Sequence, residues 1–420
     1  MPKIKNQRLE EIFNEIIEPS ENAMAAIRSL GSFRYYIDHD NHHLHKVSQN
    51  VQALVSGRKF YLDLNDKDAG KSELNDIEKF ILKVSCYVHD LGMLCTDGKQ
   101  ISLNDIEATQ KIRKIHSKNI KKILDDTPIN IIVYTEYGEK KYHGDLRTIK
   151  SIFSDRNKIS REVRKWIIRI CENHSQQPIV TLFNDNKIKP YFEFRDEQFF
   201  TDKYIRPALL IALLRLADGL VYSHEDTTNY LGDSRKSKEI KTIEDKWIRE
   251  WKDNNSVIDS NKDEFYQKQI IEYWKHEVTE KVIIDNDIST KPIKIKLIFF
   301  PDNYPKIKNE NGEFSITEIA IDDIKREFLD PEKGANGIFT EYGLEVDLYV
   351  NNEIINPIIY INGELSNLLK DKNEILYNGF LNIKQEALKN INVKYIGYNN
   401  HCDRLESILI EYFKDDIENL

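Results

Sequence analysis

The feature that most constrains this chain is a His-Asp pair at the end of an apolar helix. Apolar residues recur at helical spacing ahead of the pair; they are Ile77, Ile81, Val84, Val88 and Leu91. This spacing predicts a core-facing helix that ends just before Gly92, with His89 and Asp90 near its C-terminal end. Burying a carboxylate without a partner costs several kcal/mol, so this position calls for a cation. The pair alone is weak evidence, because His39-Asp40 is a second one.

Polar residues of metal-binding type also fall on the apolar faces of other predicted helices. His43 lies one turn after His39, at the start of a helix whose apolar residues face inward. A helix over 102–124 carries a histidine on its apolar stripe, and another histidine ends the helix that follows. The helix over 208–220 is apolar nearly all round, so we expect it to be buried, with an aspartate on its buried surface. The candidate metal ligands are therefore His43, His89, Asp90, His116, His174 and Asp218.

The length and the hydrophobic pattern predict a chain with more than one core. A chain of 420 residues is long enough for two domains, and 40% hydrophobic with 31% charged residues is typical of a globular protein. The pattern predicts a helical domain over 1–230, a helical connector over 231–279 and an α+β domain over 280–420. The fold class is thus a mainly α N-terminal part followed by an α+β part.

Smaller elements are expected within these parts. Residues 8–31 have the pattern of two short amphipathic helices. Two segments break the helical pattern, and we expect a small β-hairpin within 127–158 and another over 179–194. In the C-terminal part, alternation of apolar and polar residues predicts strands over 293–297, 344–350 and 358–361, and residues 402–413 are expected to form a final helix.

Charge and cysteine usage exclude several function classes. The net charge is −9, and residues 280–420 carry 16 basic and 26 acidic residues, which disfavours nucleic-acid binding by that part. The four cysteines are widely spaced and form no Cys-x-x-Cys pair, which disfavours a disulfide framework and a thiolate zinc site. The N-terminus lacks the apolar core of a signal peptide, and the longest apolar run, 208–214, is too short to span a bilayer. We therefore expect a cytoplasmic protein without a membrane partner.

The candidate segments resemble the HD-domain superfamily of metal-dependent phosphohydrolases. The residues that carry the resemblance are Asp38-His39-x-x-x-His43, His89-Asp90-Leu91-Gly92-Met93, His116-Ser117, His174 and Leu213-Leu214-Arg215-Leu216-Ala217-Asp218. The resemblance covers roughly residues 30–226 and implies an HD-type helical bundle in which the small β-hairpins are insertions. The segments look most similar to the HD domains of prokaryotic conflict systems, which suggests a role in antiviral defence.

The resemblance also implies a ligand set. It implies that one metal ion is held by His43, His89, Asp90 and Asp218. His116 and His174 match the positions that complete a second site in two-metal members, with Asp90 as the bridge. Mixed imidazole and carboxylate ligands suit Mn, Fe, Zn or Ni better than Mg or Ca. We therefore expect one or two divalent transition metals as cofactors.

Other residues near these motifs are candidates for catalysis and substrate binding. Asp90 and His39 are the candidate catalytic residues, and His39 could contact a phosphate, support a metal ligand or begin a helix. Arg113, Lys114 and Arg215 are candidates for phosphate binding, although a structural role is favoured for Arg215.

The favoured function is hydrolysis of a phosphoester or phosphoanhydride, with a small-molecule nucleotide as substrate, by metal-activated water. The best-known substrates of the superfamily lose support, because the Gly-Tyr-Pro motif of cyclic-di-GMP phosphodiesterases is absent and Met93 stands where those enzymes carry Lys. One alternative is a metal-dependent nuclease of a prokaryotic defence system, for which only 111–122 and 156–169 offer a basic surface. A second alternative is a non-catalytic, metal-stabilised signalling module. In each case residues 231–420 could bind a protein partner or a second copy of the chain.

Overall fold

The structure of the chain is a computed structural model. The residues it describes are 4–29, 41–62, 70–95, 106–125, 142–174, 192–193, 204–221, 276, 279–285, 293–299, 306–309, 312–315, 339, 342, 346–350 and 353–355. The predicted strand over 358–361 and the predicted helix over 402–413 lie outside these residues, as does nearly all of the predicted connector.

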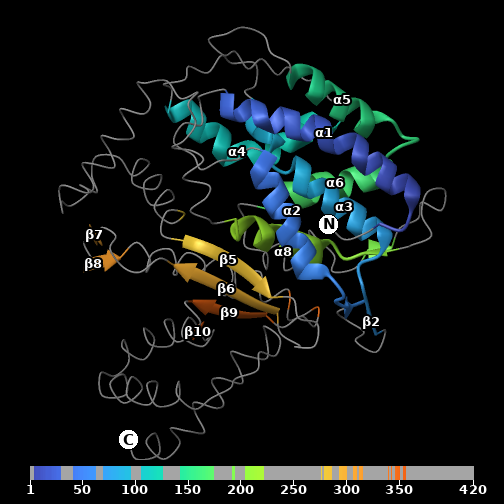
Figure 1. Ribbon diagram of the computed structural model, residues 1–420. Helices are drawn as coiled ribbons and strands as arrows, with labels where there is room; N and C mark the ends of the chain where they lie inside the picture. Colours follow the sequence, from blue (N-terminus) through green and yellow to red (C-terminus); the bar gives the residue numbers. More distant parts are fainter. Residues whose placement is uncertain are drawn as a thin grey trace, which may run out of the picture.

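The described part of the chain is mainly helical with small sheets, as the sequence predicts. Its helices are α1 (Gln7–Ser29), α2 (Asn41–Val55), α3 (Asp76–Val88), the 3-10 turn η2 (Leu91–Leu94), α4 (Ile106–Leu124), α5 (Tyr142–Ser154), α6 (Arg161–Glu172) and α8 (Pro207–Gly219). Helix α3 packs against α1, α2, α6 and α8, so it is the centre of the bundle (Figure 1). Helix α4 packs on η2, α5 and α6. The expected central helix is thus confirmed.

Helix α3 forms because its start and its interior both favour a helix. The side chain of Asn75 accepts a hydrogen bond from the backbone N–H of Glu78, and the Glu78 carboxylate accepts one from the backbone N–H of Asn75. This capping box satisfies two N–H groups that would otherwise lack a partner. Apart from Lys79, the helix is buried from residue 77 to its end, and His89 is its C-cap. Because His89 is the C-cap residue of α3, His89 and Asp90 lie at the inner end of this buried helix.

A buried ion pair joins the start of α8 to α3. The Arg206 guanidinium donates to both carboxylate oxygens of Glu78, at 2.8 and 2.7 Å, and both side chains are fully buried. Its remaining N–H groups donate to backbone carbonyls in and around the short hairpin of β1 (Phe60–Tyr61) and β2 (Lys71–Ser72). One side chain therefore ties two helices and a hairpin together.

Three local expectations differ from the structure. Residues 8–31 were expected to form two helices, but α1 is a single helix that continues through Pro19. Residues 127–158 were expected to break the helical pattern, but 142–154 form helix α5; the hairpin predicted around 131–138 lies outside the described residues. In the second predicted hairpin, β3 (Phe192–Glu193) pairs with β4 (Tyr204–Ile205), which lies beyond the predicted hairpin. Strands β3 and β4 have two residues each, so their pairing is decided by tertiary contacts rather than by local pattern.

A four-stranded sheet follows the helices. Its strand order is β10 (Glu353–Ile355), β9 (Val346–Val350), β6 (Ile293–Phe299) and β5 (Thr279–Asp285), with β6 and β9 parallel and the other pairs antiparallel. Separately, β7 (Lys306–Asn309) and β8 (Gly312–Ser315) form an antiparallel pair. Alternate residues of β6 are buried, which confirms the predicted strand over 293–297. The predicted strand over 344–350 is confirmed in β9.

The sheet and the helical bundle share a hydrophobic core. The buried residues of β6 and β9 belong to the same cluster as those of the helices, and β5 packs on α2 (Figure 1). Phe339 and Tyr342 are fully buried, and the backbone N–H of Tyr61 donates to the carbonyl of Tyr342 at 2.9 Å. The domain boundaries near 230 and 280 stay a prediction. Among the described helices, none is long and apolar enough to cross a membrane.

Candidate metal centre

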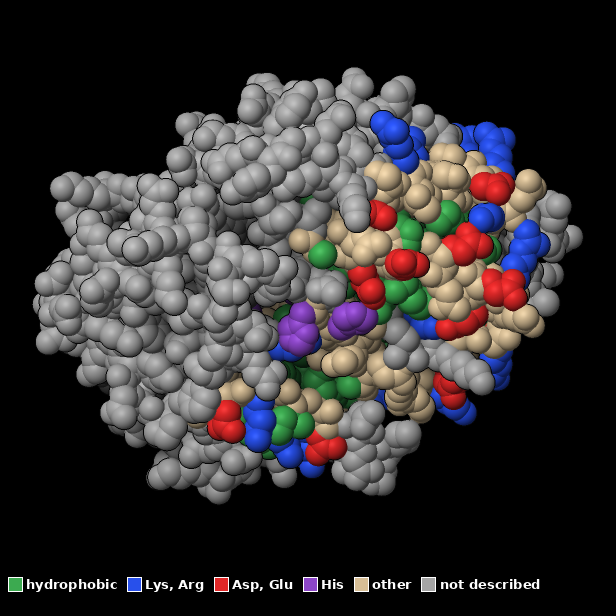
Figure 2. Space-filling view, turned by 45° about the horizontal axis from the view of Figure 1, so that its top comes forward, with side chains coloured by type: hydrophobic (Ala, Val, Ile, Leu, Met, Phe, Trp, Pro, Cys, Tyr) green, Lys and Arg blue, Asp and Glu red, His purple; other side chains and the backbone are tan. Residues whose placement is uncertain are grey.

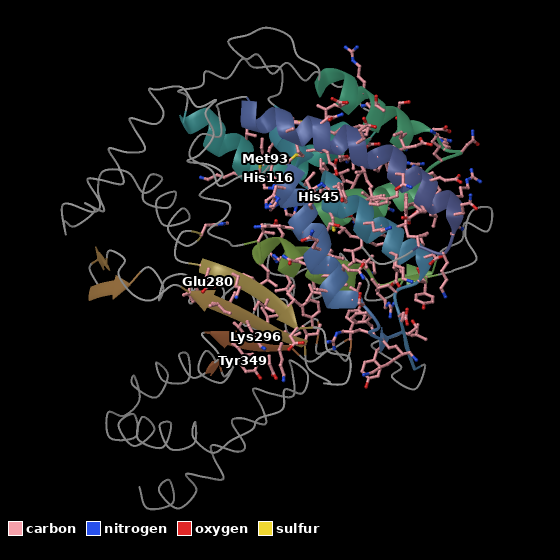
Figure 3. All side chains as sticks on the ribbon, in the orientation of Figure 1. His45, Met93, His116, Glu280, Lys296 and Tyr349 are labelled. Atoms are coloured by element: carbon pink, nitrogen blue, oxygen red, sulfur yellow. The ribbon has the colours of Figure 1, made fainter. Side chains whose placement is uncertain are left out.

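The structure brings the six predicted ligands together from five segments of the bundle. His43 lies in the first turn of α2, His89 and Asp90 follow α3, and Asp218 lies in the last turn of α8. The other two are His116 in the middle of α4 and His174 just after α6. Five of the six are buried, while the Asp218 side chain is 26% exposed. The labels in Figure 3 show His116 on the same side of the bundle as Met93 of η2, on which α4 packs.

One group of atoms, which we call the first half, surrounds one oxygen of Asp90. His43 Nε2 lies 3.1 Å from Asp218 Oδ1 and 3.5 Å from Asp90 Oδ2. His89 Nε2 lies 3.2 Å from Asp90 Oδ2 and 3.5 Å from Asp218 Oδ1. Two imidazole nitrogens thus face two carboxylate oxygens.

The second half is built on the other oxygen of Asp90. His116 Nε2 lies 3.2 Å and His174 Nε2 lies 3.5 Å from Asp90 Oδ1. The two histidine nitrogens are 3.1 Å apart. Asp90 therefore lies between the halves, with one carboxylate oxygen directed to each.

The backbone fixes the tautomers of two histidines. The Nδ1 of His89 is 3.1 Å from the carbonyl oxygen of Cys86, and the Nδ1 of His174 makes the same contact with Cys171, in each case three residues earlier. A carbonyl oxygen can only accept, so each Nδ1 carries a proton and donates it. In the neutral imidazole the Nε2 then presents a lone pair to the centre. Metal-bound histidines are held in the same way, by a hydrogen bond from the nitrogen that faces away from the metal.

Both aspartates carry negative charge, Asp90 in spite of its almost complete burial and Asp218 with its side chain partly exposed. Burial acts to raise the pKa of Asp90, but the charge of His89 and hydrogen bonds from the other histidines hold that pKa well below its usual value. Burial likewise acts to raise the pKa of Asp218, and hydrogen bonds from His43 and His89 hold it well below its usual value. The centre therefore presents carboxylates, which attract a cation.

Three of the buried histidines differ in the direction in which their pKa values are shifted. Burial acts to lower the pKa of His43, but hydrogen bonds and charge from Asp218 and Asp90 outweigh it and raise the pKa to about 9. The pKa of His89 is raised for the same reason, chiefly by the charge of Asp90. Burial lowers the pKa of His174, and the neighbouring imidazoles add to that effect. In the first half, protons can hold the place that a metal cation would take.

The donor set fits a transition metal. Ligand atoms bound to one ion at about 2.0–2.2 Å lie about 3.0–3.5 Å from one another, and the contacts of both halves are 3.1–3.5 Å. In two groups of three residues, the ligand atoms all lie within 4.8 Å of one another: His43, His89 and Asp218, and His89, Asp90 and His174. Without a cation or a shared proton, these lone pairs would repel one another.

The remaining predicted site residues are less well placed. His39 lies outside the described residues, and Arg113 belongs to α4 but its side chain is not described. Lys114 is exposed on α4, about half a turn around the helix from His116, so it points away from the centre. Arg215 is half-buried on α8, one turn before Asp218. Their substrate-binding roles stay predictions.

Three further residues contact the backbone beside the ligands, and sequence analysis did not single them out for this. They are Asn50 on α2, Gly92 in η2 and Asn119 on α4. Gly92 lies within the His-Asp-x-Gly segment, so it carried a signal, whereas an asparagine on a helix carries none.

This helical bundle gathers four histidines and two aspartates, and one histidine and one aspartate among them are adjacent in the sequence. Such a bundle is a metal-binding domain of the HD type. The chain belongs to the HD-CE family, whose model matches residues 33–327, well over half of the chain. Neither the curated proteins nor the solved structures searched gave a match. Family and cluster together are those of a metal-dependent hydrolase. The resemblance to the conflict-system branch stays a prediction.

Proposed function

We propose that this protein is a phosphohydrolase that cleaves a phosphoester or phosphoanhydride, with a nucleotide as substrate, by using a metal-activated water. The proposal rests on the orientation of the Asp90 carboxylate, whose two oxygens face two separate groups of donor atoms. A bridging carboxylate is the arrangement that holds two cations close together. When bound, the metal ions lower the pKa of a shared water and stabilise the charge that develops on an attacked phosphorus.

The protein supplies the ligands and their orientation. The first half offers His43, His89, Asp218 and one oxygen of Asp90, and the second half offers the other oxygen with His116 and His174. Imidazole and carboxylate together favour Mn, Fe, Zn or Ni. The carbonyls of Cys86 and Cys171 hold two of the imidazoles in the tautomer that a metal requires.

Burial determines where a substrate can approach. Of the six ligands, Asp218 is the one whose side chain is partly exposed, and the other five are almost completely enclosed. A phosphate group would therefore reach the centre from the side of Asp218, while the apolar walls of α3, α6 and α8 exclude water from the other sides.

The experiment that tests the proposal combines metal analysis with a substrate screen. Purified protein should contain one or two divalent transition metal ions per chain, and the loaded protein should release phosphate from a nucleotide. Chelation should remove the activity, and adding the metal back should restore it. Two bound ions with no product from any nucleotide or oligonucleotide would contradict the proposal.

A metal-dependent nuclease is the second candidate: α4 carries an exposed basic row on the face turned away from His116, which would contact the flanking part of a polynucleotide rather than the cleaved phosphate. Exposed side chains in this row are Lys114, Lys118, Lys121 and Lys122. Because a row of four lysines would neutralise several phosphates, binding of an oligonucleotide should weaken steeply with salt. A nucleotide would show a shallow slope. Elsewhere on the described surface, Figure 2 shows acidic and basic side chains interspersed on the visible face, which does not favour a polyanion there.

A further inference from the structure

The two halves of the centre are each bordered by an asparagine that holds the backbone next to a ligand. In the first half, Asn50 of α2 donates from Nδ2 to the carbonyl of Ala217, at 2.9 Å. Ala217 immediately precedes Asp218, and Asn50 lies on the helix that carries His43. This hydrogen bond fixes the last turn of α8 against α2, and so fixes Asp218 with respect to His43.

In the second half, Asn119 of α4 makes the corresponding contacts. Its Nδ2 donates to the carbonyls of Gly92 and Cys95, at 3.4 and 3.3 Å, and the side chain is 2% exposed. These carbonyls lie in and after η2, the turn that begins directly after Asp90. The contact therefore fixes α4 against the turn that follows the bridging carboxylate.

Gly92 sets how closely α4 can approach that turn. A Cβ at position 92 would lie 1.9 Å from the backbone oxygen of His116, and 3.1 Å from the backbone nitrogen of Ile120. Backbone atoms of a buried helix cannot move aside as a flexible side chain can. Any residue larger than glycine would push α4 outward at the turn that carries His116.

We propose that the two halves are positioned independently, the second by the Gly92–Asn119 contact of η2 with α4 and the first by the Asn50 contact of α2 with α8. This inference rests on the proposed two-metal centre, and it names positioning residues rather than catalytic ones. None of the three residues supplies a ligand atom. Each acts through a ligand, by holding the backbone that carries it or that adjoins it.

The inference predicts selective effects on metal binding. Mn²⁺ titrations of the full chain should resolve two binding steps. The step that His116→Ala removes belongs to the second half, and the step that Asp218→Ala removes belongs to the first half. Asn119→Ala should weaken the second-half step by about 10–100-fold, the usual effect of losing a group that supports a metal ligand, and leave the other step within about threefold. Asn50→Ala should do the reverse. Gly92→Ala should remove the second-half step.

Matched controls separate positioning from general loss of stability. Gly144→Ala on α5 is the control for Gly92→Ala, because a Cβ there meets no atom within 4 Å; it should leave both steps unchanged. Thermal melting of every variant measures stability. A purely structural role would weaken both steps together, or neither, and either result overturns the inference. If Gly92→Ala does not fold, the opposite effects of Asn119→Ala and Asn50→Ala decide the question.

A metal-independent measurement keeps this inference distinct from the proposed function. In metal-free protein, Asn119→Ala should speed backbone amide hydrogen exchange in α4 around His116 and leave the end of α8 unchanged, and Asn50→Ala should do the opposite. Unchanged exchange at both places would overturn the inference. Two normal Mn²⁺ steps without phosphate release would instead overturn the proposed function and leave the positioning inference standing.

Discussion

At the scale of single residues, Asp90 is the group on which both halves of the centre depend. It is 3% exposed and lies between histidines from α2, α3, α4 and the end of α6. Its neighbours in the sequence explain why it is there: the C-cap of α3 turns the chain, and η2 begins directly afterwards.

Replacing Asp90 with Asn should abolish metal binding in both halves. An amide is uncharged and cannot bridge two cations, so metal content and phosphate release should fall by more than about 100-fold. Metal analysis and a phosphate-release assay measure the two quantities. Asp125→Asn, at the end of α4, is the matched control and should retain both. An Asp90→Asn protein that keeps two ions would show that the carboxylate is not the bridge.

Metal binding should depend on pH through His43. Its pKa is about 9 in the metal-free protein against an ordinary value of 6.5, so at pH 7 it carries a proton that a metal must displace. Apparent metal affinity should therefore rise with pH, by up to about tenfold per unit for each proton released. In the metal-free protein, the stability that this proton contributes is fully present below 6.5 and is lost as pH rises through about 9. Calorimetry in buffers of different ionisation enthalpy counts the protons, and an affinity that is flat from pH 7 to 9 would contradict the assignment.

At the scale of secondary-structure elements, the sequence was most informative where an apolar stripe was long. Helices α2, α3, α4 and α8 follow from periodicity, and the six ligands were found because they interrupt apolar faces. The pairing of β3 with β4 and the helix α5 were not foreseen, because short or polar segments take their structure from their neighbours. Asn50 and Asn119 were missed for the same reason, since their role depends on which helix lies opposite.

The buried Glu78–Arg206 pair should be essential to how α3, α8 and the β1–β2 hairpin fit together. Glu78→Gln keeps the size of the side chain but leaves a buried guanidinium without its carboxylate, so the free energy of unfolding should fall by about 3–5 kcal/mol. Denaturant unfolding measures the change. Glu280→Gln, which removes an exposed partner of Lys281, is the matched control and should change stability by less than about 0.5 kcal/mol. Equal effects at the two positions would show that the buried pair is not what joins these elements.

At the scale of the whole molecule, the helices and the sheet are packed on one continuous core. We therefore expect the helical bundle and the sheet to unfold together. Ile295→Ala, in the fully buried face of β6, should lower the free energy of unfolding by about 2–5 kcal/mol and shift the loss of helical circular dichroism to lower temperature. Ile283→Ala on β5, where the side chain is 37% exposed, is the matched control and should have a small effect. Two separate transitions, with the helical one unchanged by Ile295→Ala, would show that the core is divided.

Asp90 is shared between two groups of ligands that differ in number, and this difference affects how the protein would respond to a low supply of metal. One side of Asp90 offers three companion donors and the other side two. When the supply of metal is low, the side with three companion donors would fill first, because it offers the larger number of ligand atoms. Under the proposed two-metal mechanism, phosphate release would then follow the occupancy of the side formed by His116 and His174, so its dependence on metal concentration would report the affinity of that side.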